Sequence, residues 1–87
     1  MTTTATKTKV RPLHEIANDI RKDWGAKMYF GARPYVQAMG TLNSIEDNYG
    51  MDSGKSIVLY FLANAGTWRG DKAREVKKEL KTLAGIK

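Results

Sequence analysis

The chain has 87 residues, a formal net charge of +6 and no cysteine. This length suffices for one domain with a modest core, and the lack of cysteine excludes disulfides, thiolate metal sites and a cysteine nucleophile. No apolar run approaches the roughly 18 residues of a membrane-spanning helix, so we expect a cytoplasmic protein without a membrane partner.

The first eleven residues are rich in threonine and contain Lys7, Lys9 and Arg11 without apolar periodicity. Segments of this composition do not form a core. We therefore expect a flexible basic tail over residues 1–11, followed by a single helical domain over residues 12–87.

Two prolines mark the starts of two expected helices. Pro12 suits the start of a helix over residues 12–24, because a proline lacks the N–H that would be unpaired in a first turn. Pro34 similarly begins a helix over residues 34–46. Gly40 lies inside this second helix at a cost of about 1 kcal/mol against alanine, which indicates either close packing of a neighbouring element or an early end.

The segment from Ser56 to Ala65 is apolar almost all round, and periodicity alone does not separate a buried strand from a buried helix. Its length and an N-cap at Asp52 or Ser53 favour a helix over residues 54–66. We expect this third helix to be buried at the centre of the domain. The alternative is a strand over "SIVLYFL" that pairs with "MYF" and makes the domain α+β.

The fourth expected helix, over residues 71–84, has an apolar, an acidic and a basic side. Its basic side consists of Arg74, Lys77, Lys78 and Lys81. Like charges at i, i+4 do not stabilise a helix, so these residues are candidates for contacting a partner or the phosphates of a nucleic acid. A solvated helix face is the common alternative. The predicted fold is an all-α bundle of about four helices.

Aromatic residues lie at predicted helix ends and in loops, namely Trp24, Tyr29, Phe30, Tyr49 and Trp68. Tryptophan and tyrosine anchor many protein interfaces, and they also close helix junctions in small domains. The two tryptophans, Tyr29 and Tyr49 are therefore candidate interface residues, with core closure as the alternative.

Residues 50–56, "GMDSGKS", resemble a phosphate-binding loop. Three residues separate Gly50 from Gly54, whereas the motif requires four, and Asp52 would repel a polyphosphate. We interpret this stretch as the start of the third helix. His14 is the only histidine, without a partner for metal binding or catalysis. No cofactor, metal or enzymatic activity is expected.

The chain resembles small proteins encoded by bacteriophages of mycobacteria and related actinobacteria. The resemblance covers about residues 16–80 and rests on "IANDIRKDW", "YFGARPYVQAM", "YGMDSGKSIVLYFLANAGTWRG" and "AREVKKELK". It implies expression in a host bacterial cytoplasm, where such proteins often bind a host component and some slow host growth. The group has no settled activity, so the resemblance assigns no functional residues.

The sequence thus favours a non-enzymatic phage protein that binds a host cytoplasmic protein and interferes with host physiology. The alternative is a nucleic-acid-binding protein that uses the basic side of the fourth helix and the tail. The sequence leaves self-association open.

Overall fold

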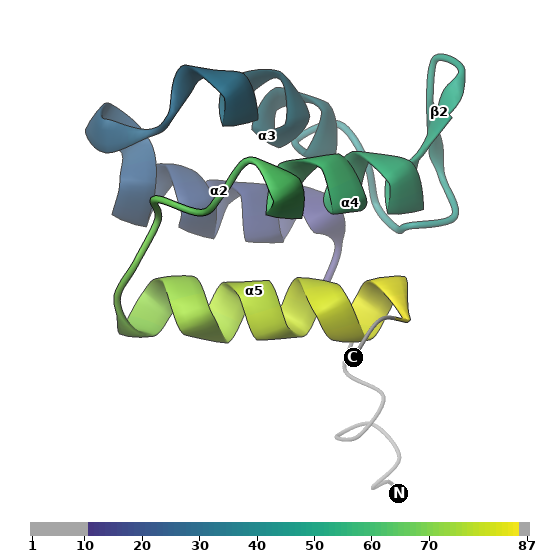
Figure 1. Ribbon diagram of the computed structural model, residues 1–87. Helices are drawn as coiled ribbons and strands as arrows, with labels where there is room; N and C mark the ends of the chain where they lie inside the picture. The colour runs from purple at the N-terminus through teal and green to yellow at the C-terminus, as the bar shows by residue number, and fades with distance from the viewer. Residues whose placement is uncertain (1–10, 86–87) are drawn as a thin grey trace, which may run out of the picture.

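The computed structural model describes residues 11–85, and these fold mainly into α-helices (Figure 1). The helices are α2 (Leu13–Trp24), α3 (Arg33–Met39), α4 (Gly54–Ala63) and α5 (Asp71–Ala84). Two 3-10 turns, η1 (Gly25–Lys27) and η2 (Phe30–Ala32), connect α2 to α3. Two short antiparallel strands, β1 (Asn48–Tyr49) and β2 (Asp52–Ser53), form a hairpin between α3 and α4. The helical prediction is therefore confirmed for the bulk of the domain, but the fold is not purely all-α.

The predicted helices differ from the observed ones chiefly in the middle of the chain. The first and fourth are confirmed to within a residue, whereas the second ends at Met39 rather than at residue 46. A turn follows it, in which the backbone N–H groups of Asn43 and Ser44 donate to the carboxylate of Asp47 at 2.9 and 3.2 Å. This local hydrogen bonding replaces the helical pattern that the apolar residues indicated.

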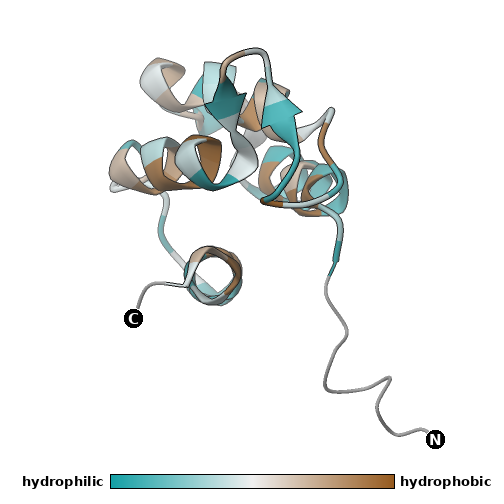
Figure 2. Ribbon diagram, turned by 90° about the vertical axis from the view of Figure 1, so that its right-hand side faces the viewer, coloured by the Kyte–Doolittle hydropathy of each residue, from teal (hydrophilic) through white to brown (hydrophobic). Residues whose placement is uncertain are grey.

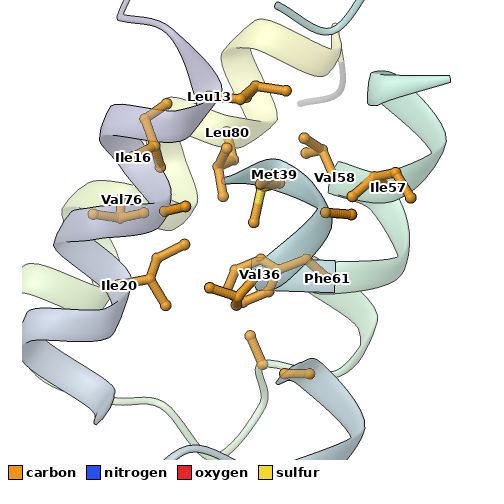
Figure 3. Packing of buried hydrophobic residues seen from close by; sticks show 14 of the residues in the cluster. Leu13, Ile16, Ile20, Val36, Met39, Ile57, Val58, Phe61, Val76 and Leu80 are labelled. Carbon is orange, nitrogen blue, oxygen red and sulfur yellow. The ribbon is translucent and has the colours of Figure 1, made fainter. Parts of the chain in front are cut away.

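Each helix packs against two neighbours, so that α2, α3, α4 and α5 surround one core. Figure 3 shows side chains from all four helices converging there. The largest fully buried side chains are Phe61, Leu13, Ile16, Ile20, Met39, Leu80, Val36, Val58 and Val76. The apolar residues on one side of α2 are all buried, namely Leu13, Ile16, Ala17, Ile20 and Trp24. Figure 2 views α5 along its axis, beneath the layer that contains the hairpin, whose strands are hydrophilic.

The third helix is not central, and this corrects the sequence-based expectation. α4 buries Ile57, Val58 and Phe61 on one side, but Leu59 and Tyr60 on its other side are exposed. An apolar helix is central only when neighbours cover its whole surface. In this domain α3 and α5 cover only part of α4, so large apolar side chains remain in contact with solvent.

The start of α4 is fixed by the hairpin and the preceding turn. The Ser53 hydroxyl accepts from the Ser56 N–H at 3.1 Å, which confirms the predicted N-cap. The N–H groups of Gly54 and Lys55 donate to the carbonyls of Asp47 and Ile45 at 2.6 and 3.0 Å. These three N–H groups therefore already have partners within the chain, and a phosphate could not be cradled by them.

Within residues 11–85, no helix has the length and apolarity required to cross a membrane.

Candidate protein-binding surface

Four aromatic residues from η2, α3 and α4 form two contacting pairs at the surface. The rings of Tyr29 and Phe30 lie with centroids 5.1 Å apart, and those of Tyr35 and Tyr60 with centroids 5.5 Å apart. Phe30 is 75% exposed, Tyr60 48% and Tyr29 44%. We refer to Tyr29, Phe30, Tyr35 and Tyr60 as the aromatic surface.

The two pairs are connected through Gly31 and Asn64. A Cβ at Gly31 would lie 2.5 Å from the Tyr29 ring and 3.1 Å from the side-chain oxygen of Asn64. The Asn64 amide in turn donates to the Tyr60 carbonyl at 2.9 Å. A glycine at position 31 thus allows the Tyr29 ring to approach the backbone closely, near the side chain of Asn64, which follows α4.

The segments that carry the aromatic surface contain cations but no acids. Between residues 24 and 45 the only charged residues are Lys27 and Arg33, and between residues 53 and 70 they are Lys55 and Arg69. Acidic side chains lie instead in α2, in the turn and hairpin, and in α5. The segments that carry the aromatic surface therefore have a net positive charge, which favours an acidic partner.

The structure corrects the assignment of Trp24 and Trp68 as interface residues. They are only 5% and 2% exposed, and their indole rings stack within the core. Trp68 also donates from Nε1 to Asp23 at 2.8 Å, which satisfies its only polar atom. Both tryptophans instead close a helix junction, which was the alternative that the sequence offered.

The two candidate tyrosines are exposed but lie far apart. Tyr29 precedes η2, whereas Tyr49 belongs to β1, and Figure 1 shows the hairpin and the η1–η2 segment at opposite ends of the molecule. The fully exposed Met51 lies beside Tyr49 at the hairpin tip. Tyr49 is therefore not part of the aromatic surface.

The sequence analysis missed Tyr35 and Tyr60. Both occur in expected helices and fit the apolar pattern, and Tyr35 is indeed partly buried against the core, whereas Tyr60 is exposed. The available signal was the phenolic hydroxyl, because a tyrosine needs a partner for this group when buried and is often found with its tip in water.

The basic side of α5 is divided between internal contacts and solvent. Lys77 donates from Nζ to the Trp68 carbonyl at 2.7 Å, and its pKa is lowered by burial and by the charges of Lys81 and Arg69. Arg74 pairs with Asp71 in the first turn. Within residues 11–85, neither Lys78 nor Lys81 has a carboxylate within 4 Å, and both are exposed. The four residues therefore do not act as one uniform free surface.

Arg11, expected at the end of a flexible tail, is held in place by two acidic side chains. Its guanidinium donates to both oxygens of Glu79 in α5, at 2.7 and 3.0 Å, and to Asp19 in α2 at 2.7 Å. The described chain thus begins with an anchored residue. Lys7 and Lys9, the other charged residues of the predicted tail, lie outside the described residues.

His14 is exposed on α2. No group of three His, Asp or Glu side chains within residues 11–85 is placed to hold a metal ion. The candidate site of the molecule is therefore the aromatic surface, which lies on segments that contain only basic charged residues. Comparison of the chain with protein-family models, with curated proteins and with solved structures found no match.

Proposed function

We propose that the chain is a small non-enzymatic protein that binds a protein partner through the aromatic surface. The observation that carries this proposal is the exposure of Tyr29, Phe30 and Tyr60, which belong to two contacting aromatic pairs whose fourth member, Tyr35, is partly buried against the core. Aromatic residues provide most of the binding energy in many interfaces, because they bury a large area with few rotatable bonds.

Tyr35 packs partly against the core, but core packing does not account for the exposed rings of Phe30 and Tyr60. Phe30 leaves three quarters of its surface in water, although burying a phenylalanine contributes about 1.5–3 kcal/mol. Clustered exposed apolar side chains in small proteins commonly mark sites of interaction. A partner that covered Phe30 and Tyr60 would recover this hydrophobic free energy.

The charge pattern supports an acidic partner, since Lys27, Arg33 and Lys55 lie on the two aromatic-bearing segments, residues 24–45 and 53–70, and neither segment contains a carboxylate. The resemblance to actinobacteriophage proteins supports a host cytoplasmic protein as this partner, and interference with host physiology, including growth, as the outcome. The proposed location is the host bacterial cytoplasm.

The test is a nuclease-treated pull-down from mycobacterial lysate with matched variants. The wild-type chain and the hairpin control Tyr49→Ala should retain the same acidic protein, and a Phe30→Ala/Tyr60→Ala double variant should lose it. Circular dichroism checks that the double variant folds. Equal retention by both variants would overturn the assignment to the aromatic surface.

The same variants distinguish other outcomes. Expression in a mycobacterial host should slow growth with the wild type and with Tyr49→Ala, but not with the double variant. Light scattering would show a concentration-dependent dimer that Phe30→Ala/Tyr60→Ala abolishes if the surface instead binds a second copy of the chain, and this result would contradict the proposed partner.

Nucleic-acid binding is the second candidate function, favoured by one observation. Arg69 and Lys81 lie close enough to Lys77 to lower its pKa, so positive potential is concentrated at this part of α5. The salt dependence of binding to random duplex DNA tests it. Binding that weakens steeply with salt and is lost in Lys78→Glu/Lys81→Glu would support this second function, because each neutralised phosphate contact contributes to the salt slope.

A further inference from the structure

A surface pocket of about 440 Å³ lies between the C-terminal end of α2 and the outer side of α3. Its lining residues are Arg21, Gly25, Met28, Arg33, Val36 and Gln37. Met28 and Val36 are buried members of the core cluster, so they provide an apolar floor. Arg21 and Arg33 come from opposite sides, one from each helix. The volume falls within the range of small-molecule sites, which combine apolar walls with a few polar groups.

Neither arginine of the pocket is neutralised by the protein. Within residues 11–85, no carboxylate lies within 4 Å of Arg21 or Arg33, and no acidic residue lines the pocket. The only hydrogen bond from the Arg21 side chain in this range goes to the Asn18 amide oxygen at 3.4 Å. Two uncompensated guanidinium groups beside one pocket create a positive potential that an anion would relieve.

Gly40 contributes to the placement of Arg21. A Cβ at position 40 would lie only 2.9 Å from Nη2 of Arg21 and 3.2 Å from the Gln37 carbonyl oxygen. The glycine that interrupts the predicted second helix thus leaves room for the guanidinium above the end of α3. Of the two alternatives given by the sequence, the early end is confirmed, because α3 ends at Met39 with Gly40 as its C-cap.

Arg33 is the first residue of α3, where a cation opposes the helix dipole. Its charge does not stabilise the helix that carries it. Gln37 lies one turn further along the same side and offers an amide that can donate or accept a hydrogen bond. The pocket thus has two cationic donors and one neutral polar group around an apolar floor.

We propose that this pocket binds a carboxylate attached to a compact apolar body. A planar guanidinium donates two parallel hydrogen bonds to a carboxylate, while the body of the ligand covers Met28 and Val36. The carboxylate can belong to a free organic acid or to the end of a polypeptide. Phe30 and Tyr60, the residues that the test of the proposed function replaces, do not line the pocket, so the two proposals can be tested independently, although Arg33 contributes charge to both.

Benzoate is the probe that tests the site, with benzamide as its neutral counterpart of the same shape. Titration of the isotope-labelled full chain, followed by NMR, should give saturable shifts of the Arg21, Arg33 and Gln37 signals with benzoate only. Arg21→Gln and Arg33→Gln should each weaken binding about tenfold or more, as expected when a charge-assisted hydrogen bond is lost. Phe30→Ala should bind benzoate like the wild type.

Further probes separate the sources of the carboxylate. An acetylated glycyl-phenylalanine with a free carboxyl end should bind at the same residues if a polypeptide end is accepted, and its amidated form should not. Tighter binding of benzoate than of this dipeptide would identify a free acid as the better ligand. Inorganic phosphate, which lacks an apolar body, should bind more weakly than either.

Three results would overturn the proposal: no saturable shift with benzoate or the dipeptide, equal binding of benzamide, or unchanged affinity in both glutamine variants. Arg21→Lys tests whether positive charge alone accounts for the binding of benzoate. It keeps the cation but loses the planar fork, so it should bind benzoate more weakly than the wild type and more tightly than Arg21→Gln. Unaltered backbone spectra would show that each variant is folded.

Discussion

The indole rings of Trp24 and Trp68 stack with their centroids 5.5 Å apart and their planes 10° apart. Trp24 ends α2, and Trp68 belongs to the loop between α4 and α5. Phe61 of α4 meets both rings edge-on, at 6.2 and 6.3 Å. This aromatic cluster joins the end of α2 to α4 and to the loop that follows α4.

Replacement of Trp68 by alanine should therefore destabilise the domain severely. The change removes a ring that is 2% exposed and leaves a cavity, which typically costs about 3–5 kcal/mol. Thermal unfolding followed by circular dichroism measures the effect. Tyr49→Ala, at an exposed position of the hairpin, should change stability by less than about 0.5 kcal/mol. Similar losses in both variants would contradict the structural role of Trp68.

Arg11 should stabilise the domain by joining α2 to α5. Arg11→Met removes its hydrogen bonds to Glu79 and Asp19, and charge-assisted bonds of this kind suggest a loss of about 2 kcal/mol at pH 7. For a domain of this size, such a loss lowers Tm by roughly 8–16 °C. Arg74→Met is the matched control, because its ion pair is exposed and should contribute less than about 1 kcal/mol.

The contribution of Arg11 should also depend on pH. The hydrogen bond from Arg11 lowers the pKa of Asp19 below its usual value. A carboxylate whose pKa is lower in the folded than in the unfolded state stabilises the fold above the unfolded value of about 3.9, and this stabilisation is lost as pH falls through the folded pKa. The difference between wild type and Arg11→Met should thus shrink below about pH 4. A difference that stays constant to pH 2 would contradict this linkage.

The sequence predicted best those parts of the fold that local chemistry determines. The apolar stripe of α2, from Leu13 to Trp24, and the charged pattern of α5 each identify a helix to within a residue. Ser53 could be recognised as an N-cap because its hydroxyl meets the N–H of Ser56 within one turn. Such interactions span only a few residues and require no knowledge of the tertiary structure.

The parts that the sequence did not predict depend on contacts across the chain. Whether Tyr60 is buried depends on how much of α4 its neighbours cover, and Arg11 is ordered by Glu79, 68 residues away. The pocket also requires Arg21 of α2 to meet Arg33 of α3. The periodicity of α4 did not show which side would remain exposed, because nearly every position was apolar, and the hydroxyl of Tyr60 was the one available signal.

The pKa of Lys77 should depend on the charged side chains around it. Burial is the main cause of its lowered pKa, and the charges of Lys81 and Arg69 add to it. Because this pKa lies below the usual lysine value of about 10.4, the folded protein releases this proton before the unfolded chain does. The contribution of Lys77 to stability therefore rises with pH between the two values.

NMR titration of the lysine side chains should show the pKa of Lys77 below the usual value. Lys81→Gln should raise it towards that value, because a repelling charge is removed. Thr82→Gln, which removes no charge, is the control and should leave it unchanged. A pKa of Lys77 that Lys81→Gln did not raise would show that these two side chains lie further apart than the structure indicates.

The close approach of Gly54 to the preceding turn gives a prediction about the start of α4. A Cβ at this position would lie 2.7 Å from the Ser44 carbonyl oxygen and 2.8 Å from the Ile45 Cα. Because both contacts are to backbone atoms, the turn would have to shift, and Gly54→Ala should cost about 1–3 kcal/mol as in other overpacked sites. Chemical denaturation measures this cost, and Gly66→Ala is the control.

A Cβ at Gly66 meets no atom within 4 Å and the φ of Gly66 is not positive. Gly66→Ala should therefore be neutral or slightly stabilising, since alanine restricts the unfolded chain. Equal stability of the two variants would show that Gly54 is not required for close packing.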